Sequence, residues 1–80
     1  MKFTYDPRYN IAYLRFCNKH KDVETIHISE ELNIDLAPDG TIYGIELLNA
    51  NKQIKREDMG RFLFVDESTG KSAELSLAAA

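Results

Sequence analysis

The segment that most constrains the fold is residues 32–50, LNIDLAPDGTIYGIELLNA. Apolar residues alternate with polar or small ones on both sides of a Pro-Asp-Gly turn, and this period of two predicts an antiparallel hairpin. Pro38 suits the first corner of a tight turn, and Gly40 can adopt positive φ without steric cost. The alternating apolar residues are Leu32, Ile34 and Leu36 before the turn and Tyr43, Ile45 and Leu47 after it.

The loop of this hairpin conflicts with its apolar pattern. A three-residue loop closed by Gly40 as a bulge would pair Ala37 with Thr41 and would place the two apolar rows on opposite faces. An even-numbered loop would place both rows on one face, because a shift of one residue turns every side chain over. We favour the even-numbered loop, since one buried face usually sets the register. If the Pro-Asp-Gly turn prevails, both faces of the hairpin must be partly covered.

Chain length and charge limit the class of protein. Eighty residues predict a single domain, residues 1–80, and a domain of this size buries only about 60% of its unfolded surface. An intimate homodimer would add buried area without adding chain. The net charge of −3 argues against a nucleic-acid partner. No apolar run approaches the ~20 residues of a membrane helix, and no signal-peptide segment is recognised, so we expect a cytoplasmic protein.

The rest of the first half contains three more strand patterns. Alternation predicts strands at residues 2–5, 11–17 and 23–29, joined by short polar loops. Short loops join antiparallel neighbours, whereas parallel strands need long crossovers. The sequence therefore predicts an α+β, mostly β, fold: an antiparallel meander sheet of five to seven short strands, with one short helix after the hairpin of residues 32–48.

The pattern changes after the hairpin. Asn49 is a good helix N-cap, and we expect a helix of about two or three turns that ends by Gly60. The apolar run within residues 61–66 is typical of a strand buried on both faces. Residues 71–77 alternate and favour a strand, although the alanine-rich ending leaves a helix open.

Three segments, taken in order, resemble a known family. They are FTYDP at residues 3–7 followed by IAYLRF at 11–16, IDL at 34–36 with Asp39-Gly40, and GIELLNA at 44–50. Over roughly residues 2–52 the chain resembles the small prokaryotic family catalogued as domain of unknown function 2283. The resemblance implies a small antiparallel sheet with one helix. It implies no known activity and provides no catalytic residues. The chain departs from the family pattern at residues 8–10 and after Lys55.

One cysteine and two histidines form the first candidate group, for metal binding or for nucleophilic catalysis. Cys17 and His20 are three apart, and His27 lies on a nearby predicted strand. A structural zinc site needs four ligands, and a cysteine nucleophile needs an adjacent base and an oxyanion donor. An edge cysteine and two solvated histidines are the simpler interpretation. We therefore expect no metal and no cofactor, and one cysteine allows no internal disulfide.

Carboxylates form the second candidate group. Asp35 and Glu46 alternate away from the apolar rows, so we expect them to share the outer face of the hairpin. A close pair of carboxylates would raise one pKa and suit acid–base chemistry or cation binding. Such residues are more often turn formers and part of a solvated sheet face, and this is the interpretation we favour.

The strongest interaction signal is the run Phe62, Leu63, Phe64 and Val65. A core this small cannot easily bury four successive apolar residues, and exposed apolar patches mark interfaces. We predict a non-enzymatic protein that acts by protein–protein contact as a homodimer, with a second small protein as a further partner, as in an antitoxin-like two-gene module. The alternative is a small-ligand or metal-binding enzyme that uses Asp35 and Glu46, or Cys17 and the two histidines.

Overall fold

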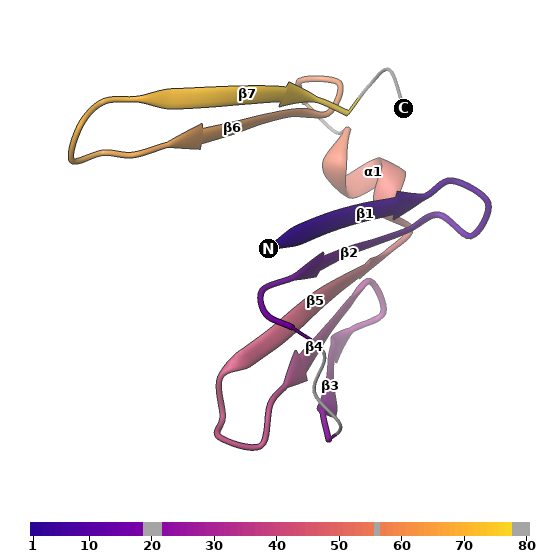
Figure 1. Cartoon of the computed structure of the whole chain (residues 1–80). Coiled ribbons are helices and arrows are strands. Elements are labelled where there is room, and N and C mark those ends of the chain that lie inside the picture. The colour runs from indigo at the N-terminus through magenta and orange to yellow at the C-terminus, as the bar shows by residue number, and fades with distance from the viewer. Residues whose placement is uncertain (19–21, 56, 78–80) are drawn as a thin grey trace. The chain divides into compact units, whose positions relative to one another are not determined.

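The computed structural model describes residues 1–18, 22–55 and 57–77. The chain forms two compact units, Met1–Ala50 and Asn51–Ala80 (Figure 1). The strands are β1 (Lys2–Asp6), β2 (Ile11–Arg15), β3 (Glu24–Ser29), β4 (Leu32–Leu36), β5 (Ile42–Leu48), β6 (Arg61–Val65) and β7 (Ser72–Ser76), and the helix is α1 (Ala50–Ile54). The predicted fold class, mostly β with one short helix, is confirmed. A single domain over residues 1–80 stays a prediction.

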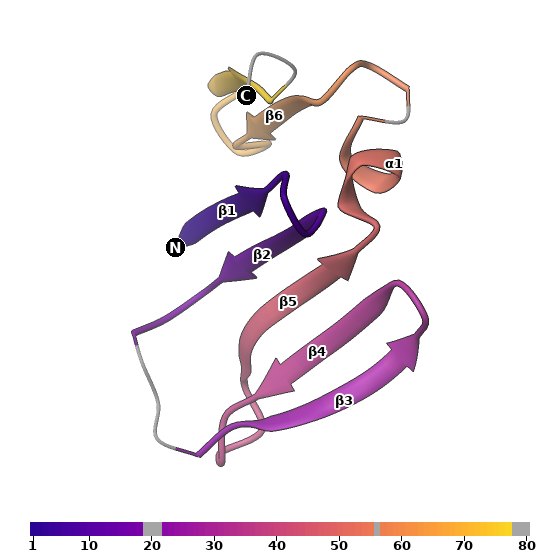
Figure 2. The ribbon, with the colours of Figure 1, turned by 90° about the vertical axis from the view of Figure 1, so that its right-hand side faces the viewer.

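The first unit is a five-stranded antiparallel sheet in the order β1-β2-β5-β4-β3, and Figure 2 shows the five strands side by side. Strands β3, β4 and β5 form a meander as predicted. However, β2 pairs with β5 rather than with β3. This order places the longest strand, β5, at the centre, and it leaves β3, whose six residues are all exposed, at an edge.

The turn of the central hairpin has three residues, so the predicted even-numbered loop is wrong. The amide of Ala37 donates to the carbonyl of Thr41 at 2.8 Å, and the amide of Gly40 donates to the carbonyl of Ala37 at 2.9 Å. Gly40 has a φ of 87°, which an L-residue rarely adopts. The Pro-Asp-Gly turn therefore sets the loop.

A β-bulge nevertheless restores the predicted apolar register. Leu36 pairs with Ile42 next to the turn, but the pairing shifts between Leu36 and Asp35, and Ile34 then pairs with Ile45. Tyr43 is the extra residue of this bulge. One inserted residue reverses the facing of everything beyond it. The tight turn and the single apolar face, which conflicted in the sequence, therefore coexist.

One face of the sheet is apolar across all five strands. Residues paired across strands share a face, so the register defines a central apolar row that runs through Phe3, Leu14, Ile45, Ile34 and Ile26. A second row on this face is formed by Tyr5, Ala12, Leu47 and Leu32.

The described part of residues 1–50 forms a single layer, the five-stranded sheet, and supplies no second layer for this apolar face (Figure 2). In the described parts of the chain, the buried residues are all small: Ala12, Ala37, Gly44, Ala50 and Gly60. The large apolar side chains of the sheet are half-buried or exposed, and Ile26 is 38% exposed. Stable domains pack at least two layers around a core, so the sheet face is an incomplete core.

Helix α1 is shorter than predicted. It covers five residues and ends at Ile54, before Gly60. The predicted N-cap role of Asn49 is also wrong, because Asn49 has a φ of 53° and its side-chain oxygen accepts a hydrogen bond from Asn10 Nδ2 at 3.1 Å. An N-cap residue has extended geometry and bonds the helix amides instead. Within the described residues, no helix has the length and hydropathy needed to cross a membrane.

The second unit contains the β6–β7 hairpin. The prediction of a strand within residues 71–77 is confirmed, and β7 pairs antiparallel with β6. The prediction that β6 is buried on both faces is wrong within this chain, because all five of its residues are exposed. Among the described elements its only strand neighbour is β7, and its four apolar side chains are exposed.

Candidate functional site

The face of the sheet opposite the apolar rows carries a polar network. The register places two rows on it. The first row is Thr4, Tyr13, Glu46, Asn33 and His27, and the second is Lys2, Arg15, Gly44, Asp35 and Thr25. The candidate site is therefore a surface built from all five strands.

Asp35 on β4 is the centre of the network. Tyr13 Oη donates to Asp35 Oδ2 at 2.6 Å, and Thr25 Oγ1 donates to Asp35 Oδ1 at 2.6 Å. Tyr13 extends from β2 across the backbone of β5 at Gly44, where an added Cβ would clash with the phenol ring. A glycine inside a strand often marks such a close approach. Gly44 therefore permits a contact between strands that are not neighbours.

This environment raises the pKa of the Tyr13 phenol well above its usual range. Burial is the largest cause, followed by the hydrogen bond to Asp35 and the negative charge of that carboxylate. Tyr43 and Glu46 add smaller effects in the same direction. The phenol therefore stays protonated at neutral pH and acts as a hydrogen-bond donor to Asp35.

A second chain of hydrogen bonds crosses the adjacent row. His27 Nδ1 lies 2.8 Å from Asn33 Oδ1, and Asn33 Nδ2 donates to Glu46 Oε1 at 3.0 Å. The prediction that Asp35 and Glu46 share the outer face is confirmed by the register. Each carboxylate accepts hydrogen bonds from neutral side chains, so the arrangement holds the strands together on this face.

The cysteine and histidine candidates are not brought together. Cys17 follows the end of β2, and His27 lies on β3, which is separated from β2 by β5 and β4. His20 lies outside the described residues. Among the residues that the structure describes, no three metal-binding side chains of the His, Cys, Asp or Glu type form a cluster.

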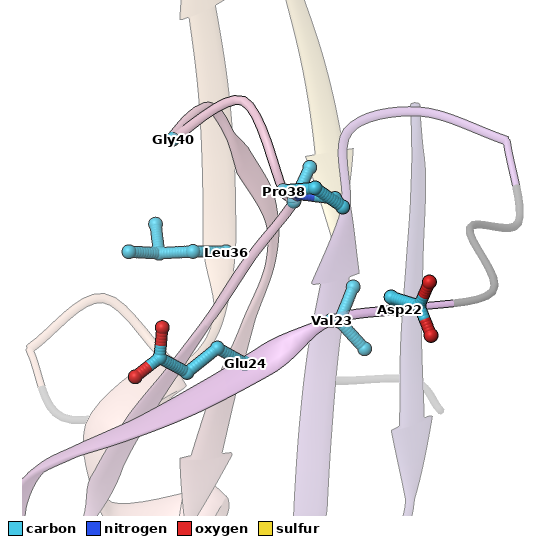
Figure 3. Close-up of a pocket in the computed structure, with 7 residues that line it drawn as sticks. Asp22, Val23, Glu24, Leu36, Pro38 and Gly40 are labelled. Carbon is cyan, nitrogen blue, oxygen red and sulfur yellow. The ribbon is translucent and has the colours of Figure 1, made fainter.

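Two shallow depressions lie on the sheet unit. One, of about 330 Å³, is on the polar face and is lined by Lys2, Thr4, Tyr13, Arg15, Asp35 and Tyr43. The other, of about 480 Å³, lies beside the hairpin turn and is lined by Asp22, Val23, Glu24, Leu36, Ala37, Pro38 and Gly40. In Figure 3, Glu24 and Leu36 extend to the same side, as their pairing requires. This second depression therefore joins the margin of the apolar face.

The structure divides the predicted interface run between two faces of the β6–β7 hairpin. Phe62 and Phe64 pair with Leu75 and Ala73, so one face is wholly apolar over these positions. Leu63 and Val65 lie on the other face. That face also carries the ion pair between Arg61 and Glu74. The hairpin is amphipathic rather than apolar throughout.

Sequence reasoning missed Tyr13, Thr25 and Tyr43 as parts of the polar surface. The strand patterns single out neither Tyr13 nor Thr25, and the alternation in residues 32–50 predicts Tyr43 in an apolar row. The bulge explains why Tyr43 lies on the polar face, because one extra residue interrupts the alternation of side chains between the two faces. Gly44 is the signal that could have located Tyr13, since a glycine within a strand indicates a close neighbour.

The comparisons with known proteins agree with this description. The model of a family described as "Protein of unknown function (DUF2283)" matches residues 2–51, which is more than half of the chain. These residues contain the whole five-stranded sheet and all the members of the polar network. No curated protein and no solved structure matches the chain. The chain belongs to this DUF2283 family.

Proposed function

We propose that this protein acts by protein–protein contact as a homodimer, in which the apolar faces of two five-stranded sheets pack against each other. The observation that carries the proposal is the absence of any large buried side chain in the described chain. An 80-residue protein is marginal even with a full core. A second copy would complete the missing layer.

The chemistry of the face suits a second copy. Its two central rows contain no charged residue, and a two-fold contact places the same surface on both sides of the interface. Two sheets that pack face to face lie about 10 Å apart, with strand directions crossing at about 30° or about 90°. Burial of each large apolar side chain contributes roughly 1.5–3 kcal/mol.

The size of the face indicates that the hairpin contributes as well. Strands lie about 4.8 Å apart and rise about 3.4 Å per residue, so five strands of about five residues make a flat face of about 400 Å². A stable interface removes about 800 Å² of accessible surface from each partner. Projecting side chains raise the accessible area above the flat area. Phe62 and Phe64 form the second apolar surface available for contact.

Adjacent residues of β3 provide a matched test. Ile26 is on the apolar face and His27 is on the polar face, and both are exposed at the sheet edge. We expect wild-type protein to sediment at twice the 9.2 kDa of one chain. Ile26→Lys should weaken the dimer by about tenfold or more, the equivalent of about 1.4 kcal/mol. His27→Lys adds the same charge and should leave the mass unchanged. A monomeric wild-type protein would refute the proposal.

The second partner is part of the same proposal. Among the described strands, β3 pairs only with β4, and all six of its residues are exposed. An exposed edge can accept a strand from another chain, which supports a small partner protein. We propose that the pair is antitoxin-like and acts in the cytoplasm. Pull-down of the full chain from native cells, followed by mass spectrometry, tests this. Recovery of a partner with wild-type protein but not with an Ile28→Pro variant would support strand addition. Recovery with both would place the partner elsewhere.

A further inference from the structure

We propose that the depression on the polar face binds a small molecule through an oxyanion group, a carboxylate or a phosphate, held between Lys2 and Arg15. The depression has a volume of about 330 Å³, which is at the lower end of ordinary ligand sites. This inference is independent of the proposed dimer, because the site lies on the opposite face of the sheet.

The first observation is the juxtaposition of two cations. Lys2 on β1 and Arg15 on β2 are directly paired in the register, and both line the depression. Like charges at directly opposed positions destabilise a sheet. An anion between them would remove this repulsion.

The second observation is that nearby carboxylates do not neutralise these cations. Within the described chain, the ion pair is Arg61–Glu74, and no carboxylate lies within ion-pair distance of Lys2 or Arg15. Asp35, two strands from Arg15 in the same row, has one oxygen bonded to Tyr13 and the other to Thr25. The hydrogen bonds of Asp35 are therefore directed along the network and not toward the cations.

The third observation is the chemistry of the remaining lining. Tyr13 is held as a neutral donor to Asp35, and Thr4, on the same face as the two cations, also lines the depression. Tyr43, the extra residue of the bulge, also lines the depression. Aromatic side chains provide apolar contact together with a polar tip. The site therefore suits a compact ligand with one oxyanion end and a planar body.

The charge of Asp35 limits the ligand further. Its carboxylate lines the same depression as the two cations. An extended polyanion that filled this depression would bring negative charge toward Asp35, which is unfavourable. A single oxyanion can contact Lys2 and Arg15 at the opposite end. The site is therefore proposed for a small molecule rather than for a nucleic-acid backbone.

The test is an NMR titration of the ¹⁵N-labelled full chain with two probes, phenyl phosphate and benzoate, at constant ionic strength. We expect saturable shifts of the amides of Lys2, Arg15 and Gly44 with one or both probes, and the tighter probe identifies the preferred oxyanion. Arg15→Gln should weaken binding by about tenfold or more, since a charge-assisted hydrogen bond is lost. Arg8→Gln removes the same charge in the β1–β2 turn and should change affinity by less than about twofold.

Three outcomes would overturn the proposal. The first is the absence of saturable shifts with both probes. The second is an equal loss of affinity in Arg8→Gln and Arg15→Gln, which would indicate attraction by net charge alone. The third is tighter binding of a single-stranded oligonucleotide than of either probe. Lys2→Gln, at an exposed position of the edge strand β1, provides a second variant if Arg15→Gln unfolds.

Discussion

The two compact units of this chain hold their strands by different means. In the sheet unit, β2, β5 and β4 each pair on both sides, and Tyr13, Asp35 and Thr25 connect three strands on one face. In the hairpin unit, each strand has one neighbour, and the side-chain link across it is the exposed pair Arg61–Glu74. A lone two-stranded hairpin is marginal in water. The difference indicates that the hairpin depends more heavily on contacts outside its own strands.

The family match follows the same division. It covers residues 2–51, and the sheet unit is Met1–Ala50. The β6–β7 hairpin lies wholly outside the match. The polar surface and the apolar sheet face therefore lie within the residues that match the family model, whereas the hairpin lies outside them.

The largest expected effect comes from a charge at the centre of the sheet. Ile45 lies in the middle of the apolar row on the central strand. Ile45→Asp should lower the free energy of unfolding by more than about 3 kcal/mol, since it places a charge among apolar side chains. Leu63→Asp, at an exposed position of the hairpin, should cost less than about 0.5 kcal/mol. Urea denaturation measures both, and equal losses would remove the distinction between the units.

The two faces of the hairpin give the next comparison. Phe64 is 63% exposed and Leu63 is 58% exposed, but they lie on opposite faces. Phe64→Asp should dissociate the dimer or unfold the protein, because Phe64 lies on the wholly apolar face. Leu63→Asp should leave the mass unchanged. Sedimentation velocity and a thermal melt check both variants. An unchanged mass and melting temperature for Phe64→Asp would refute the contact role of the run from Phe62 to Val65.

The polar network gives an intermediate effect. Gly44→Ala should lower the free energy of unfolding by about 1–3 kcal/mol, because Tyr13 must leave Asp35 and a hydrogen bond to a charged group is lost. In a Tyr13→Ala background the same change should cost little, since the clash is absent. A double-mutant cycle by urea denaturation measures this coupling. Additive effects would show that Tyr13 does not cross Gly44 in solution.

Substitutions of the two turn glycines should have smaller effects on stability, and each should affect a different part of the molecule. Gly40 and Gly70 have φ values of 87° and 73°, and an alanine at either would be strained by about 1–2 kcal/mol. Hydrogen exchange should show that Gly40→Ala weakens protection across the sheet. Gly70→Ala should weaken protection only in β6 and β7. Loss of sheet protection in Gly70→Ala would indicate that the two units unfold together.

The smallest effects are expected in the pH dependence of stability. The sheet unit should lose stability at alkaline pH and the hairpin unit at acid pH. Tyr13 has a raised pKa. Its hydrogen bond therefore contributes fully to the stability of the folded protein below the pKa of a tyrosine in the unfolded chain, about 10, and this contribution is lost as the pH rises through the folded pKa. Asp66 in the β6–β7 turn has a lowered pKa, chiefly because Ser68 donates to it. Its contribution is present above the ordinary value of 3.8 and is lost as the pH falls through the folded pKa.

Two variants separate the alkaline loss of stability from the acid loss. Tyr13→Phe should remove the latest tyrosine transition in an absorbance titration and flatten the alkaline loss of sheet stability. Asp66→Asn should flatten the acid loss of hairpin protection. An alkaline transition of Tyr13 at the ordinary tyrosine pKa would contradict the network geometry.

The strands of the sheet unit were predictable because alternation is strong on both sides of their turns, whereas β6 was predicted from its run of four apolar residues. The pairing of β2 with β5 was not, because the apolar patterns of β3 and β5 both suit a neighbour of β2. The bulge at Tyr43 was also hidden. A three-residue loop and an even-numbered loop were each consistent with the sequence. The backbone shows that a bulge allows the three-residue turn and the single apolar face to occur together.

The candidate site was predictable only in part. The placement of Asp35 and Glu46 on one face follows from a period of two. Their partners do not, because Tyr13 reaches Asp35 across an intervening strand, a contact that depends on the missing side chain of Gly44. At Asn49 the sequence predicted a role that the residue does not have. Asn49 is a favourable helix-capping residue, but its side chain instead accepts a hydrogen bond from Asn10 near the end of β5.

In the proposed dimer, a second copy covers the apolar face of the sheet. Isotope-filtered NOE spectroscopy on a mixture of labelled and unlabelled wild-type chains observes this contact between copies. We expect intermolecular NOEs from the methyl groups of Leu14, Ile34 and Ile45. A dimer with intermolecular NOEs confined to the polar face or the hairpin, or a protein with none, would contradict this arrangement.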